Sequence, residues 1–69
     1  MMNDSNKELA TRIAAQRADG EASRLAAAGH LDRALLKLMT ARALFLDLGS
    51  EAKVDEIDIT MASWRNLMG

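Results

Sequence analysis

Residues 31–48 have the sequence LDRALLKLMTARALFLDL, and this stretch is apolar on two sides at once. At 100° per residue, six residues form the main apolar stripe of a helix: Leu31, Ala34, Leu38, Ala41, Phe45 and Leu48. A second set, spaced 3, 4 and 3, lies on a neighbouring flank: Leu36, Met39, Ala43 and Leu46. Only a narrow polar edge remains, which Leu44 interrupts: Arg33, Lys37, Thr40 and Asp47. Such a helix is normally buried over most of its circumference.

The length of the chain limits how that helix can be covered. The 69 residues allow one small domain, 1–69, and a domain of this size buries only about 60% of its unfolded surface. Chains this short usually depend on disulfides, a metal or oligomerisation. The sequence has no cysteine and one histidine, so we expect no disulfide, no metal site and no cofactor. Association remains, with a second copy of the chain or with a larger protein.

The charge and hydropathy of the chain argue against nucleic acid and membranes as binding partners. A net charge of −1 is neither the footprint of a nucleic-acid-binding protein nor that of a disordered polyanion. Met1–Ser5 lacks the basic and apolar regions of a secretory signal. No uninterrupted apolar run exceeds four residues, so we expect no membrane span and a cytoplasmic protein. Thirteen alanines, and six arginines against three lysines, indicate a high-GC bacterial or phage source.

The apolar spacing predicts an all-α fold without strands. We expect helices at about 5–28, 31–48 and 51–67, forming a helical hairpin plus a third helix. Short connections predict that neighbouring helices are antiparallel. Because the central helix is apolar on two sides, we expect the chain to form an intertwined helical homodimer.

Polar residues and glycines mark the expected ends of the helices. Ser5–Glu8 matches a capping box, and Ser50 is placed to cap the third helix. Gly29 and Gly49 are expected to end the first and second helices. Gly20 lies within the first helix, where the apolar face shifts. We expect that helix to be continuous, because one glycine costs only about 1 kcal/mol relative to alanine.

The third helix carries one apolar stripe with spacings of 3, 4, 3 and 4: Val54, Ile57, Met61, Trp64 and Met68. Ile59 lies about 170° from the centre of this stripe, so it points outward or towards another chain. Trp64 suits either the core or an anchor at an interface, where aromatic residues are enriched.

Part of the chain resembles a single tetratricopeptide-type helical hairpin. The matching residues lie between positions 22 and 41: Ala22, Leu25, Gly29, Leu31, Ala34, Leu38 and Ala41. The resemblance implies a glycine turn between two closely packed helices, and peptide or protein binding in a groove. The chain departs from the family pattern in having no aromatic residue at Ala18 or Leu25, and no proline after the second helix.

Charged side chains supply candidate contacts with a partner. Glu51, Asp55 and Asp58 share one side of the third helix, as a solvated acidic face or as a docking surface for a basic partner. Arg42 interrupts the apolar stripe of the second helix. We expect it to pair with a carboxylate, to lie at the edge of an interface, or to extend its stem towards water.

The remaining candidates carry no recognisable chemistry. His30 precedes the second helix, and no serine, cysteine or carboxylate is placed beside it as in a catalytic triad. Arg17 and Arg24 share a side of the first helix and are candidate polar contacts. A helix-turn-helix reading of Leu25, Gly29 and Leu35 places leucines where polar base-reading residues are needed.

These observations predict a non-enzymatic protein–protein interaction module that acts as a homodimer. We expect a small regulator or inhibitor of a larger protein, encoded by a phage or mobile element. The predicted apolar interface consists of Leu36, Met39, Ala43, Leu46, Ile59 and Trp64. The alternatives are a tetratricopeptide-like adaptor that binds a peptide in a groove, and a DNA-binding regulator.

Overall fold

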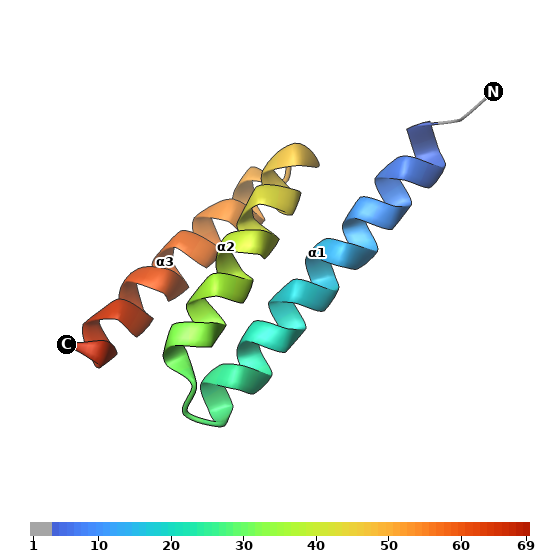
Figure 1. The fold of residues 1–69 in the computed structure, drawn as a ribbon. Helices are drawn as coiled ribbons and strands as arrows, with labels where there is room; N and C mark the ends of the chain where they lie inside the picture. The colour runs from blue at the N-terminus through green and yellow to red at the C-terminus, as the bar shows by residue number, and fades with distance from the viewer. Residues whose placement is uncertain (1–3) are drawn as a thin grey trace.

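The computed structural model describes residues 4–69, which form three helices and no strand (Figure 1). α1 covers Asp4–Ala27, α2 covers Leu31–Asp47 and α3 covers Glu51–Met68. The prediction of an all-helical chain with three helices is therefore confirmed. α2 lies between the other two helices and packs against both (Figure 1).

The same backbone turn ends α1 and α2. Gly29 and Gly49 have φ angles of +88° and +75°, a region that glycine adopts without the steric cost of a Cβ atom. In the first turn, the N–H of His30 donates to the carbonyl of Leu25 at 2.8 Å, and that of Gly29 donates to Ala26 at 3.0 Å. The second turn repeats this pattern at 2.9 and 3.0 Å. Both are Schellman motifs, so the prediction that these glycines end the helices is confirmed.

The starts of the helices differ from the prediction. Ser50 precedes α3, but its side chain makes no capping hydrogen bond, so the prediction that it caps this helix is wrong. His30 precedes α2 in the same way and also makes none. The ψ angles of 74° and 64° at these residues fall short of the β region that an N-cap residue usually adopts. Ser5, the other expected cap, lies one residue inside α1.

The core lies where α2 meets its two neighbours. α1 contributes small residues, which let the two helices approach closely. The buried residues come from all three helices: Ala15, Ala18 and Ala22 of α1, Ala34, Leu38, Ala41 and Phe45 of α2, and Val54, Ile57 and Met61 of α3. The central members of the main stripe are thus the buried side of α2, as the spacing predicts.

α1 is one continuous helix through Gly20, which confirms the prediction of an unbroken helix. Its apolar residues nevertheless face two directions. Ala18 and Ala22 are buried against α2, whereas Leu9 and Ile13 are 55% and 48% exposed. The shift of the apolar face along α1 therefore marks residues that are left about half exposed in the described structure.

Replacing Gly20 with alanine is expected to stabilise the protein by about 0.5–1 kcal/mol, because alanine restricts the unfolded chain and favours the helix. A Cβ atom at this position would meet only the Arg24 guanidinium, at 3.9 Å. The matched control is Gly29→Ala, which forces a Cβ atom into the left-handed region and should cost about 1–2 kcal/mol. Thermal unfolding of both variants tests this pair, and a lower Tm for Gly20→Ala would contradict it.

Candidate association surface

The second apolar set of α2 forms a line of exposed side chains, which we call the outer stripe: Leu36, Met39, Ala43 and Leu46. Its three large members are 64%, 51% and 55% exposed. Single exposed apolar residues are common on protein surfaces, but several in one line mark a site of interaction. The spacing of 3, 4 and 3 residues is that of the a and d positions of a coiled-coil seam.

The outer stripe has no neighbour because both other helices pack on the opposite side of α2. At 100° per residue, its centre lies roughly 150° from the centre of the buried stripe. The prediction that the second set lies on a neighbouring flank is therefore wrong. In the described part of the chain, no Cα atom of α1 comes within 8 Å of α3. With both α1 and α3 packed on the inner side of α2, neither helix covers its outer side.

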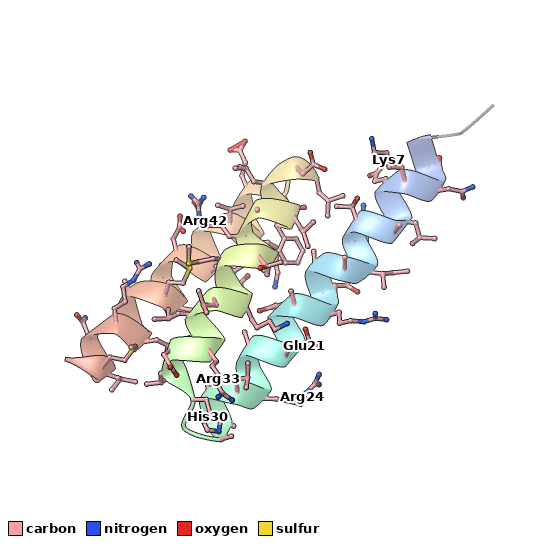
Figure 2. The ribbon with its side chains drawn as sticks, in the orientation of Figure 1. Lys7, Glu21, Arg24, His30, Arg33 and Arg42 are labelled. Atoms are coloured by element: carbon pink, nitrogen blue, oxygen red, sulfur yellow. The ribbon has the colours of Figure 1, made fainter. Side chains whose placement is uncertain are left out.

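An arginine–aspartate pair borders the outer stripe on the side of α3. Arg42 points from α2 towards α3 (Figure 2), and its Nε and Nη2 atoms donate to the two carboxylate oxygens of Asp58 at 2.6 and 3.3 Å. These hydrogen bonds lower the pKa of the Asp58 carboxyl and raise the pKa of the Arg42 guanidinium. The expected carboxylate partner of Arg42 is thus Asp58, and one of the three predicted acidic residues is already engaged within the chain.

On the side of α1, the outer stripe is bordered by one ion pair and by two charges without an ion pair among residues 4–69. Lys37 forms an ion pair with Glu21 of α1 at 3.4 Å. Arg33 and Asp47, two turns on either side of Thr40, take part in no ion pair of the described structure. They leave one positive and one negative charge available at opposite ends of the outer stripe.

The structure separates the other predicted interface residues from the outer stripe. Ile59 is exposed on the side of α3 that faces away from the core. Trp64 is partly buried and packs against the core cluster. Arg17 and Arg24 are exposed on α1, and Arg24 points away from α2 (Figure 2). These four residues therefore lie on α1 and α3, outside the line of the outer stripe on α2.

The acidic side of α3 keeps two of its exposed carboxylates, Glu51 and Asp55. Within residues 4–69, no group of three or more histidine, cysteine, aspartate or glutamate side chains is arranged to hold a metal ion.

His30 is exposed in the turn between α1 and α2 (Figure 2). None of the described helices has the length and hydropathy needed to cross a bilayer.

Sequence reasoning missed the contacts that join α1 to α3. The Nζ atom of Lys53 lies 3.6 Å from an oxygen of Asp19 and 5.4 Å from the centre of the Phe45 ring. Lys53 thus links all three helices through one ion pair and one cation–π contact. No sequence signal could have found this residue, because its partners are set by the relative positions of the helices.

Replacing Asp58 with asparagine should lower stability at neutral pH and have little effect in acid. The folded-state pKa of Asp58 lies below its ordinary value of 3.8, so its contribution is present above that value and is lost as the pH falls through the folded-state pKa. We expect the Tm of Asp58→Asn to be lower than that of the wild type at pH 6, and the difference to shrink as the pH falls below 3.8 and through the folded-state pKa of Asp58. Asp55→Asn is the control, since that carboxylate accepts no hydrogen bond from Arg42. A constant difference between pH 6 and pH 2 would contradict the assignment.

Comparison with known proteins adds no assignment. The chain matches no protein-family model, no curated protein and no solved structure.

Proposed function

We propose that this chain is a protein–protein interaction module that acts as a homodimer, with its three helices antiparallel within each copy and the outer stripe as the dimer seam. The observation that carries the proposal is the line of exposed apolar residues on the central helix. Water contact with Leu36, Met39 and Leu46 costs free energy that a second apolar surface would recover, at about 25 cal/mol per Å² of apolar area buried.

The need for a second copy also follows from the size of the core. Among the residues that the structure describes, Leu38 is the only large side chain that is fully buried. A single core in a protein of this length rarely supplies more than about 3–5 kcal/mol. The sequence has no cysteine for a stabilising disulfide, so a second copy that covers the outer stripe would supply the stability that the small core lacks.

We propose regulation or inhibition of a larger protein as the role of the dimer. The support is a second exposed surface on α1, outside the seam, where Leu9 and Ile13 precede Arg17 and Arg24 on the side turned away from α2. An apolar pair followed by two arginines suits a partner surface that combines an apolar groove with carboxylates. The proposal includes no catalytic role.

The test is the solution mass, measured by light scattering behind a sizing column over a range of concentrations. We expect a mass near twice 7.5 kDa at high concentration, and a Tm that rises with concentration because dissociation accompanies unfolding. A folded monomer at every concentration would contradict the homodimer. It would favour the alternative of a tetratricopeptide-like adaptor that leaves the outer stripe open to a peptide.

A further inference from the structure

We infer that the two copies of α2 pack antiparallel, in a register that sets Leu36 against the partner's Leu46 and Met39 against the partner's Ala43. This inference rests on the proposed homodimer and adds the orientation and register of the seam. Two independent features of α2 favour it over a parallel pair: the sizes of the stripe residues, and the charges beside them.

The sizes of the stripe residues fit an antiparallel pair. In that orientation, each large Met39 meets the small Ala43 of the partner, and leucines meet at both ends of the seam. The two central layers are then equal, and each alanine is compensated by a large residue opposite it, which favours close packing. In a parallel pair, alanine would meet alanine in one layer and methionine would meet methionine in another. The alanine layer would be underfilled relative to its neighbours, and an unfilled space between packed side chains is destabilising.

The charges on the α1 side of the seam fit the same orientation. Arg33, Thr40 and Asp47 are spaced by seven residues, so they occupy equivalent positions beside the stripe. In an antiparallel pair, this edge runs against the same edge of the partner in the opposite direction. Arg33 of each copy then lies beside the partner's Asp47, and the two Thr40 residues lie near the two-fold axis. The seam thus gains two ion pairs from charges that form none within residues 4–69.

The α3 side of the seam is compatible with this register. Arg42 would lie near Arg42 of the second copy, where two free guanidinium groups would repel each other. Each Arg42 guanidinium is instead paired with Asp58 of its own chain, with 2.6 Å between Nε of Arg42 and the nearer carboxylate oxygen. A parallel pair would instead bring Arg42 towards the partner's Asp47 and leave Arg33 without a partner. The antiparallel register therefore uses the unpaired charges, and the parallel register competes with an existing pair.

Oxidative cross-linking tests the orientation, because the chain contains no cysteine of its own. Met39→Cys and Ala43→Cys are prepared separately, mixed, equilibrated and oxidised, and mass spectrometry distinguishes the products by their different masses. We expect the mixed disulfide to dominate, because the two positions face each other across an antiparallel seam within disulfide range. Dominant Ala43→Cys homodimers, each closed by one disulfide, would establish the parallel pair and overturn the inference.

A charge exchange tests the register without touching the stripe. Arg33→Asp and Asp47→Arg should each raise the dimer Kd roughly three- to tenfold, as expected for losing two exposed ion pairs and creating like-charge contacts. The double variant should return to within about twofold of the wild type. Weakened helices cannot produce this result, because each single change places a more favourable charge near its end of the α2 dipole.

The outcomes separate the inference from the proposed function. A wild-type chain that stays monomeric by light scattering contradicts the homodimer itself. A stable dimer whose Kd is unchanged in both single charge variants contradicts the register alone. A stable dimer with mixed disulfides and restored affinity in the double variant supports both.

Discussion

A variant with both Leu36→Glu and Met39→Glu is expected to lose self-association, with its Kd raised by at least about three orders of magnitude. If these positions form the seam, dimerisation would bury four unpaired carboxylates, two from each copy. Burying unpaired charges costs several kcal/mol, and about 1.4 kcal/mol corresponds to a tenfold change in Kd. Light scattering should then give a mass near 7.5 kDa at concentrations where the wild type is dimeric.

The matched control for this variant is Leu9→Glu with Ile13→Glu. Both pairs are about half exposed or more and lie within one turn of a helix, but Leu9 and Ile13 point away from α2. The control should keep the wild-type mass. Because Leu36 and Met39 are exposed within one chain, glutamate at these positions costs a monomer little. If the Leu36→Glu, Met39→Glu variant stays folded with an unchanged mass, the assignment of the outer stripe as the dimer seam is wrong.

Circular dichroism shows whether the chain needs the dimer in order to fold. Loss of helix in the Leu36→Glu, Met39→Glu variant, with helix retained in the control, would show that the seam contributes to the stability of the chain. The single variant Met39→Glu then provides an intermediate Kd while the protein remains folded.

Most of the helical architecture could be predicted from local signals. Gly29 and Gly49 end helices because the left-handed backbone of a Schellman turn favours glycine, and that preference is visible in one sequence. The main stripe of α2 also follows from spacing alone. The cap at Ser50 could not be predicted reliably, because its backbone conformation is set by the turn before it.

The candidate surface was predictable only as a pattern along one helix. The spacing identifies the outer stripe, and an arginine beside an apolar stripe indicates a carboxylate partner. The identity of that partner, Asp58, depends on how α3 is placed along α2. The outward position of Ile59, by contrast, follows from its place opposite the apolar stripe of the third helix. Contacts between helices require a register that no single helix specifies.

Leu38→Ala is expected to unfold the protein or leave it only marginally folded, which is the largest effect on stability that we predict. Leu38 is 2% exposed and lies in the core where α2 meets its neighbours. Within residues 4–69, it is the one large side chain that is fully buried. Removing a buried leucine side chain costs about 2.7–5 kcal/mol, through lost burial and the cavity that remains. That cost is comparable to the whole stability that a core of this size provides, about 3–5 kcal/mol.

Leu38→Met is the matched control, because it nearly preserves volume and should cost less than about 1.5 kcal/mol. Denaturant unfolding followed by circular dichroism measures both variants. A Leu38→Ala protein within about 1 kcal/mol of the wild type would contradict this account of the core. The comparison with the Leu36→Glu, Met39→Glu variant is informative, since the two sets of residues lie on opposite sides of one helix. Damage to the inner side should remove the fold, whereas damage to the outer side should first remove the association.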